Sequence, residues 1–265
     1  MSLQNHQDSS CKYRVMVVED SQVIYQVIKS QVEKLGLGVD YAENGFEAVR
    51  LFQSGKHAVI LMDCQMPIMD GYEATGIIRS LEEKAGGHIP IIAMTAASSA
   101  DSIDNCILAG MDDYMTKPFS LESLARMLIK WVPCLKSVID IAEASEENSP
   151  QKTPTSVIDL EQLRSYVGDD EEVKQYVISD YLKHSHERIE AVRRAITARD
   201  SGEIRRITHA FKAVNAFVGA AAMVAILKEM EQGAIEEQYA EEEQLFVELV
   251  KNHDLVCQAL SELKT

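Results

Sequence analysis

The first half of the chain alternates short segments of strand character with longer segments in which apolar residues recur every three or four positions. Short apolar runs bounded by turn signals are typical of strands buried on both faces of a parallel sheet. Apolar positions spaced by three and four indicate one face of a helix. We therefore predict five strands alternating with five helices, in a right-handed parallel arrangement. The predicted strands cover residues 14–18, 39–42, 58–62, 89–94 and 113–116.

Polar residues and glycines mark the ends of the predicted helices. Ser21 and Asn44 precede two of the periodic segments and can cap them, and a third helix is expected to start near Asp70. Gly36 and Gly55 follow the first two segments, where glycine ends a helix without strain. The other two helices of this half are expected at residues 101–109 and 121–131.

The second half has a different pattern. Ser, Glu, Pro, Thr and Asn dominate the stretch after residue 133, which is the composition of a flexible linker, and no strand signal follows it. Long periodic segments with short connections then predict an all-α bundle. The expected order is a disordered N-terminus, an α/β domain, a linker and the bundle. Their ranges are 1–11, 12–133, 134–157 and 158–265.

Charge and cysteine content narrow the functional classes. The formal net charge is −16, and both predicted domains are acidic, with 11 basic and 16 acidic side chains in residues 12–133 and 13 and 21 in residues 158–265. Because nucleic-acid-binding domains usually carry a basic surface, no nucleic acid partner is expected.

The five cysteines form no Cys-x-x-Cys pair, which indicates free thiols. No apolar run approaches the ~18 residues of a membrane span, so no direct membrane insertion is expected.

Four of the predicted strands end in side chains that suit phosphoryl transfer. Glu19 and Asp20 follow the first strand, Asp63 the third, Thr95 the fourth and Lys117 the fifth. Because the carboxyl ends of parallel strands share one edge of the sheet, these side chains are expected to meet there. Clustered carboxylates repel one another, and Mg²⁺, which prefers oxygen ligands, relieves that repulsion. Asp63 is then the candidate nucleophile, although a lone Asp can equally start a turn or cap a helix.

Residues 12–133 resemble the receiver domain of two-component signalling. The matching residues, besides Glu19-Asp20 and Thr95-Ala96, are Met62-Asp63-Cys64-Gln65-Met66-Pro67, Met69-Asp70-Gly71 and Lys117-Pro118-Phe119. The resemblance implies a flavodoxin-like (βα)5 domain with a parallel five-stranded sheet.

The receiver resemblance also implies roles for single residues. Asp63 would be the phosphoacceptor, and Mg²⁺ would be bound by Glu19 or Asp20, Asp63 and the backbone carbonyl of Gln65. Thr95 and Tyr114 fall at the family's switch positions, where the hydroxyl moves toward the phosphoryl group and the ring turns inward. A cis Lys117-Pro118 bond is implied as well.

The helix expected around residues 203–222 places one histidine off its apolar stripe. His209 shares a face with Arg205, Lys212 and Ala213, at helical spacings of three and four. An exposed imidazole beside cations can accept a phosphoryl group whose charge the cations offset. A lone surface histidine is more often an ordinary solvated one, so both interpretations stay open on these residues alone.

The segment His209-Ala210-Phe211-Lys212 through Gly219-Ala220 is similar to the signature of histidine-containing phosphotransfer (Hpt) domains. The resemblance implies a four-helix bundle in which His209 is the phosphorylated histidine, Lys212 supports it and Gly219 is a packing glycine. The family usually has a glycine and serines just after the lysine, whereas this chain has Ala213, Val214 and Asn215. The extra methyl of Ala213 would slow transfer or alter partner choice.

Two rival histidines are interpreted differently. His184 and His186 have Glu187 and Ile189 at the third following position, where His209 has its lysine. Both are expected to be surface residues of the long helix predicted at residues 170–199.

Together the two resemblances imply a phosphorelay protein similar to the C-terminal part of a hybrid sensor histidine kinase. Asp63 would receive a phosphoryl group from the phosphohistidine of an upstream sensor histidine kinase. His209 would relay it to or from a receiver aspartate, with a downstream receiver-domain response regulator as partner. No ATP-binding kinase core is present, so autophosphorylation from ATP is not expected. The expected location is the cytoplasm, as a free-standing protein or as the cytoplasmic part of a membrane-bound sensor.

Two other functions fit parts of the pattern. Phosphorylation of Asp63 would control an interaction between the domains if His209 were not a phosphocarrier. A metal-dependent phosphatase of a related α/β fold is disfavoured, because such enzymes usually need a second acid two residues after the nucleophile and Gln65 stands there.

Overall fold

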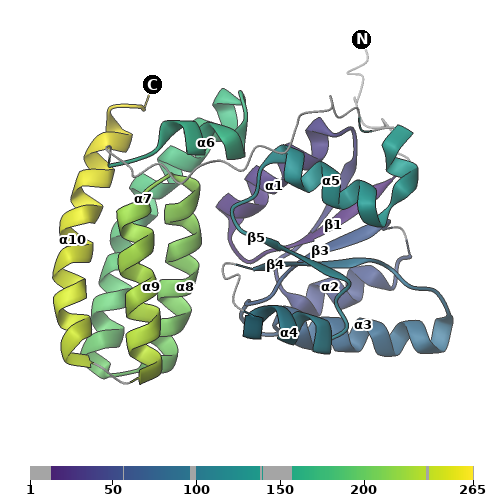
Figure 1. The fold of residues 1–265 in the computed structure, drawn as a ribbon, viewed down its shortest axis with the longest axis horizontal. Helices are drawn as coiled ribbons and strands as arrows, with labels where there is room; N and C mark the ends of the chain where they lie inside the picture. The colour runs from purple at the N-terminus through teal and green to yellow at the C-terminus, as the bar shows by residue number, and fades with distance from the viewer. Residues whose placement is uncertain are drawn as a thin grey trace, which may run out of the picture.

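The computed structural model describes residues 13–55, 57–95, 100–137, 139, 157–236 and 239–264. An α/β domain is followed by an all-α bundle, as predicted (Figure 1). The predicted disordered N-terminus and most of the predicted linker lie outside the described residues. No helix in the described ranges has the length and apolar character needed to cross a membrane.

The sheet of the first domain has five parallel strands in the order β2-β1-β3-β4-β5. The central strands β1, β3 and β4 are apolar at consecutive positions because helices cover both faces of the sheet, and this is why their pattern predicted them. The strands are β1 Arg14–Val18, β2 Gly38–Ala42, β3 Val59–Asp63, β4 Ile91–Thr95 and β5 Asp113–Thr116.

Alternate residues of the central strands enter two separate hydrophobic clusters. Val15 and Val17 pack with helices α1 and α5, whereas Met16 and Val18 pack with α2 and α3. Figure 1 shows the two helical layers on opposite faces of the sheet. The helices are α1 Gln22–Lys34, α2 Gly45–Phe52, α3 Gly71–Ala85, α4 Ala100–Leu108 and α5 Leu121–Trp131.

Of the two predicted caps, Asn44 and Ser21, only Asn44 caps its helix with its side chain, and Asp70 caps the helix that was expected to start near it. The side chains of Asn44 and Asp70 accept hydrogen bonds from the third residue of their helices. Ser21 occupies the N-cap position of α1 but makes no capping hydrogen bond with its side chain. Its backbone N–H donates instead to Oε1 of Glu19 at 3.2 Å, which fixes the loop at the end of β1.

The second domain is a four-helix bundle preceded by one short helix. Neighbouring helices of the bundle contact each other in the cycle α7-α8-α9-α10. Gly219, at φ +71°, lies where an added Cβ would be 2.4 Å from the backbone oxygen of Asp159, so this glycine permits the close approach of the segment before α6. The helices are α6 Leu160–Val167, α7 Glu171–Ala198, α8 Ser201–Phe217, α9 Ala221–Glu236 and α10 Tyr239–Ser261.

The ordered chain extends past the predicted domain boundary at residue 133. Pro133–Ser137 forms a short 3-10 helix, and the side chains of Leu135 and Ile139 are buried in the cluster that contains α1 and α5. Composition alone assigned these residues to the linker because two apolar side chains do not change the average of a polar segment.

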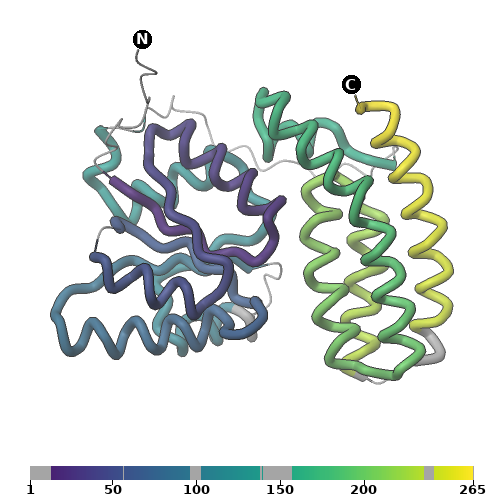
Figure 2. The backbone as a smooth tube through the Cα atoms, turned by 180° about the vertical axis from the view of Figure 1, so that it is seen from behind, coloured from purple at the N-terminus to yellow at the C-terminus, as the bar shows by residue number. Residues whose placement is uncertain are grey.

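Helix α1 joins the two domains, since it also contacts α6 and α7 (Figure 2). Nε2 of Gln31, which is 2% exposed, donates to the carbonyl oxygens of Phe119 at 3.1 Å and Tyr166 at 2.7 Å. Nζ of Lys34 donates to the carbonyl oxygen of Val167 at 3.1 Å. The last carbonyls of α6 thus find donors on the other domain. The same hydrophobic cluster continues from α1 into the bundle, so the domains share a packed interface.

Candidate functional site

The ends of β1 and β3 bring three carboxylates together. Glu19, Asp20 and Asp63 each offer an oxygen, and these oxygens all lie within 4.8 Å of one another. Asp63 is the last residue of β3, and Glu19 directly follows β1, so parallel pairing of the two strands places them side by side. Glu19 and Asp63 are buried, and Asp20 is half-buried.

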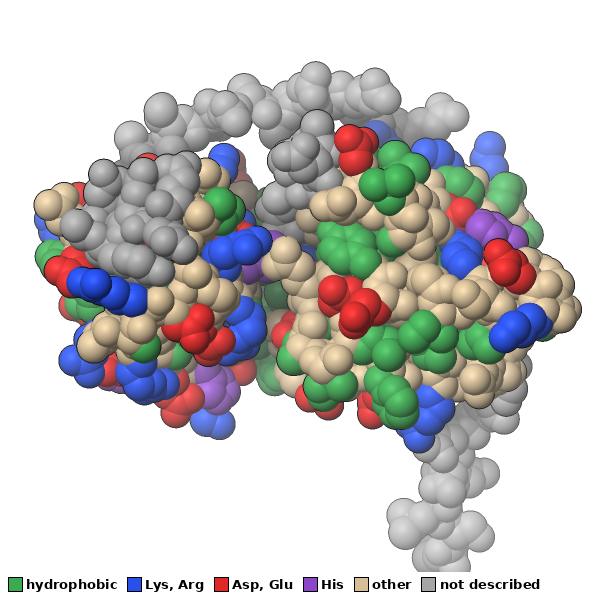
Figure 3. All heavy atoms as spheres, turned by 90° about the horizontal axis from the view of Figure 1, so that it is seen from below, with side chains coloured by type: hydrophobic (Ala, Val, Ile, Leu, Met, Phe, Trp, Pro, Cys, Tyr) green, Lys and Arg blue, Asp and Glu red, His purple; other side chains and the backbone are tan. Residues whose placement is uncertain are grey.

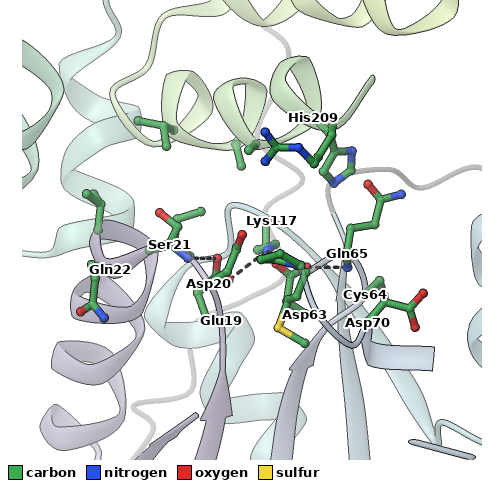
Figure 4. A pocket seen from close by; sticks show the side chains of 18 of the residues that line it. Glu19, Asp20, Ser21, Gln22, Asp63, Cys64, Gln65, Asp70, Lys117 and His209 are labelled. Atoms are coloured by element: carbon green, nitrogen blue, oxygen red, sulfur yellow. Dashed lines mark hydrogen bonds and ion pairs between the residues drawn. The ribbon is translucent and has the colours of Figure 1, made fainter. Parts of the chain in front are cut away.

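Lys117 lies between two of these carboxylates. Its Nζ is 2.9 Å from Oε2 of Glu19 and 2.9 Å from Oδ2 of Asp63 (Figure 4). Burial and the neighbouring carboxylates raise the pKa of Glu19 to about 8 against the opposing effect of Lys117. Burial lowers the pKa of Lys117, but Asp63 and Glu19 outweigh it, so this pKa is raised. The convergence that the sequence predicted is therefore present.

The cluster has the donor set of a hard divalent cation. Three carboxylates face one ammonium group, which leaves an excess of negative charge. The pKa of Asp20 is raised, mainly by burial and secondly by the charge of Asp63. The backbone N–H of Gln65 donates to Oδ1 of Asp63 at 3.3 Å, which holds the loop after β3 against the same carboxylate. Oxygen ligands of this kind fit Mg²⁺.

The predicted switch residues lie on neighbouring strands. Thr95 is the buried last residue of β4, and its carbonyl oxygen accepts a hydrogen bond of 2.7 Å from the backbone of Lys117. Tyr114 in β5 is 37% exposed, so its side chain is at the surface in this structure. The Lys117-Pro118 bond is cis, as the receiver resemblance implied.

His209 is less exposed than the sequence suggested. Its side chain is 13% exposed, and its Nδ1 lies 3.0 Å from Oε1 of Glu231. Lys212 is buried and forms an ion pair with the other carboxylate oxygen of Glu231. The expectation of an exposed imidazole was therefore wrong, because α9 supplies a carboxylate that pairs with His209 and with Lys212.

Glu231 is the partner of His209 and Lys212 that the sequence reasoning missed. Burial opposes its ionisation, but hydrogen bonds from His209 and Lys212 outweigh that effect and lower its pKa to about 2. A weak signal was present, since Leu227, Met230 and Ala234 at helical spacing around it are apolar and buried. That pattern places Glu231 near the core side of α9 without indicating what it binds.

Both predicted phosphoryl carriers line one cavity. Asp63 and Gln65 line it from the α/β domain and His209 and Ala213 from the bundle, and its volume is about 620 Å³. Figure 4 shows the His209 ring on the side of the cavity that faces Gln65 and Asp63. Figure 3 shows the groove between the domains from below. The structure thus brings Asp63 and His209 to one cavity, although they are 146 positions apart in the sequence.

The other residues named from the sequence differ in whether they line this cavity. Thr95, Tyr114 and Lys212 are not among the described residues that line it. His184 does line it, with its Nδ1 3.0 Å from Oδ1 of Asp180, although it was predicted to be an ordinary surface residue. His186 is exposed, as expected.

Comparison with known proteins identifies both halves of the chain. The family described as "Response regulator receiver domain" matches residues 15–129, and the family described as "Hpt domain" matches residues 177–265. The chain joins a receiver domain to an Hpt domain. Receiver and Hpt domains together support a role in a two-component phosphorelay.

Curated relatives that match this chain include a histidine kinase and a sensor protein. "Probable histidine kinase 1" of Oryza sativa subsp. indica is 37% identical over 154 residues, which are 47% of this chain and 16% of that protein. "Sensor protein GacS" of Pseudomonas syringae pv. syringae is 39% identical over 124 residues, which are 46% of this chain and 14% of that protein. The chain thus spans about a sixth or less of these relatives.

A solved receiver structure also matches the first domain. It is the receiver domain of sensor histidine kinase PA1611 from Pseudomonas aeruginosa PAO1, with a magnesium ion coordinated in its active site cleft. It is 39% identical, and the match covers 46% of this chain and 98% of that chain with a TM-score of 0.43.

Proposed function

We propose that this chain is a phosphorelay intermediate in which Asp63 and His209 both carry the phosphoryl group. Asp63 accepts it from the phosphohistidine of a sensor histidine kinase, and His209 relays it to or from a receiver aspartate. The observation that carries the proposal is that Asp63 and His209 line the same cavity. The upstream partner is a sensor histidine kinase, and the downstream partner is a receiver-domain response regulator.

In the first step a carboxylate oxygen of Asp63 attacks the phosphorus of the donor phosphohistidine. A P–O bond forms, the P–N bond breaks, and the donor imidazole leaves with the electron pair. Lys117, 2.9 Å from Asp63, would bind a phosphoryl oxygen, and the hydroxyl of Thr95, which follows the strand partner of Asp63, would donate to another. Mg²⁺ held by Asp63, Glu19 or Asp20 and the backbone carbonyl of Gln65 supplies further charge neutralisation when it is bound.

In the second step the acyl phosphate of Asp63 passes to His209. The hydrogen bond between Nδ1 and Glu231 assigns the proton to Nδ1 and leaves the Nε2 lone pair as nucleophile. A P–N bond forms at Nε2, the acyl P–O bond breaks, and Asp63 leaves as a carboxylate. The ring becomes cationic, and the Glu231 carboxylate stabilises that charge.

A second candidate function is an interaction switch in which His209 is not a phosphocarrier. The contact of α1 with α6 and α7 favours it, because a phosphoryl group at Asp63 could loosen or tighten that interface. The two functions differ in whether phosphate ever reaches His209.

Phosphoryl transfer from a labelled donor tests the proposal. A donor kinase labelled on its histidine is mixed with the chain and Mg²⁺, and the label is located in the parent, in Asp63→Ala and in His209→Ala. We expect label on both residues of the parent, none in Asp63→Ala and an acyl phosphate alone in His209→Ala. A His186→Ala control should behave as the parent. Label confined to Asp63 in the parent would contradict the relay and support the switch.

A further inference from the structure

Arg188 on α7 presents an unpartnered donor inside the cleft between the domains. Its Nη1 is buried and makes no hydrogen bond, and the described residues supply no ion pair to it. Buried polar groups in native proteins are hydrogen-bonded as a rule, and a guanidinium N–H without a partner is an exception that points to a missing ligand.

The position of Arg188 is set by its helix and by one aromatic ring. Asp180, His184 and Arg188 are spaced by four residues, share one face of α7 and all line the cavity that contains Asp63 and His209. Cζ of Arg188 lies 6.0 Å from the centroid of the fully buried Phe211 ring, so the guanidinium is held against a rigid surface. The donor therefore has a fixed place in the cleft.

The other described cations of the cavity are already paired. Lys117 contacts Glu19 and Asp63, and Arg206 binds Glu203 through two hydrogen bonds of 2.7 Å. Asp180, on the face of α7 that carries Arg188, is bonded to His184 through Oδ1, whereas its buried Oδ2 has no hydrogen-bond partner and makes no ion pair with Arg188. Among the described lysines and arginines that line this cavity, Arg188 is therefore the one without a carboxylate partner.

The surroundings of Arg188 contain charges from both domains. Burial lowers the pKa of its guanidinium, while Asp180, Tyr181 and, across the cleft, Asp20 oppose that effect. A dianionic phosphoryl group between Asp63 and His209 would satisfy the donor and offset the burial of its charge.

We propose that the Arg188 guanidinium binds the phosphoryl group while it passes between Asp63 and His209. This inference rests on the proposed relay. As the acyl P–O bond of Asp63 breaks and the P–N bond to Nε2 of His209 forms, negative charge is spread over the three equatorial phosphoryl oxygens. A planar guanidinium can donate two parallel hydrogen bonds to two of these oxygens. The Nδ1 proton stays on the ring beside Glu231, and Asp63 departs as a carboxylate.

A purely structural arginine would act differently. If Arg188 only packed on Phe211, its replacement would lower the free energy of unfolding and leave the transfer rate of the folded protein unchanged. The test therefore measures the transfer step and the loading of Asp63 in the same variants.

The experiment uses the full chain, acetyl phosphate as donor and Mg²⁺, followed by removal of the donor. Conversion of the acyl phosphate into phosphohistidine is timed in the parent, Arg188→Gln, Arg188→Lys and the exposed control Arg194→Gln. We expect about a 100-fold slower conversion in Arg188→Gln, since removal of one positioned donor has effects of this order. Arg188→Lys should fall between it and the parent, Arg194→Gln should match the parent, and all should load Asp63 equally in a His209→Ala background.

A spectroscopic readout makes the result independent of folding defects. The ¹⁵N side-chain resonance of Arg188 in the otherwise unchanged chain should shift when beryllium trifluoride, a phosphoryl mimic, is added with Mg²⁺. Equal conversion rates in the parent and Arg188→Gln, or an unmoved Arg188 resonance, would overturn the assignment. Absence of phosphohistidine in the parent itself would instead overturn the proposed relay, so the two failures are distinguishable.

Discussion

Nδ1 of His209 lies 3.0 Å from Oε1 of Glu231, so the imidazole that we propose as phosphocarrier and a carboxylate on the next helix form a pair. Such a pair fixes the ring orientation and the tautomer, and it stabilises the imidazolium that forms during transfer. The second oxygen of Glu231 binds Lys212, which therefore acts on His209 through this carboxylate.

Replacement of this carboxylate should slow transfer without blocking Asp63. Glu231→Gln keeps the size but removes the charge, and its amide can hold the wrong tautomer of His209. We expect phosphohistidine formation to fall about 100-fold or more, by analogy with carboxylate-to-amide changes beside other catalytic histidines. Rapid-quench transfer kinetics measure the effect. Glu229→Gln, an exposed neighbour on α9, is the matched control, and a Glu231→Gln rate equal to that of the parent would rule out the pairing role.

The same pair predicts a pH dependence of stability. Hydrogen bonds from His209 and Lys212 outweigh burial and hold the pKa of Glu231 at about 2, below its usual value of 4.5. A depressed carboxyl pKa contributes stability that is fully present above about pH 4.5 and is lost as the pH falls toward 2. Urea unfolding of the parent should therefore lose more stability between pH 5 and pH 2 than that of Glu231→Gln, and parallel curves would argue against the prediction.

Magnesium should stabilise the receiver domain through its acidic cluster. Because an ion that binds only the folded state stabilises it by mass action, Mg²⁺ at 100 times its dissociation constant should add about 2.7 kcal/mol to the free energy of unfolding. Asp20→Asn should weaken this effect by removing one of the three clustered carboxylates. Asp104→Asn, at an exposed position on α4, should not. Chemical unfolding with and without Mg²⁺ provides the measurement, and equal responses of the two variants would contradict the assigned site.

The interface at α1 should favour transfer within one molecule. Gln31→Ala removes the donor to the carbonyl oxygens of Phe119 and Tyr166 and leaves buried acceptors unsatisfied, at about 1–3 kcal/mol. We expect slower conversion of the acyl phosphate into phosphohistidine, with loading of Asp63 unchanged. Glu33→Ala, at an exposed position of the same helix, is the control. Unchanged conversion in Gln31→Ala would show that docking through α1 does not matter for transfer.

Much of the fold and half of the site could be predicted because the signals are local. The apolar runs of β1, β3 and β4 indicated buried parallel strands, and the shared edge of a parallel sheet then required Glu19, Asp63 and Lys117 to meet. These conclusions need only the order of elements along the chain.

The rest of the site depends on contacts between helices that are far apart in the sequence. Glu231 and Arg188 lie on α9 and α7, and no spacing along the chain connects them with His209 on α8. The reduced exposure of His209 has the same origin, because Glu231 and the facing receiver domain cover a ring that helical periodicity alone places at the surface.

A single-chain chase tests the central claim most directly. Asp63 is loaded with labelled acetyl phosphate and Mg²⁺, the donor is removed, and the acyl phosphate and phosphohistidine of the parent are followed over time at several protein concentrations. The account predicts that label leaves Asp63 and enters His209 with a rate constant that does not change with concentration. Loss of the acyl phosphate to inorganic phosphate alone, with no phosphohistidine at any concentration, would contradict it.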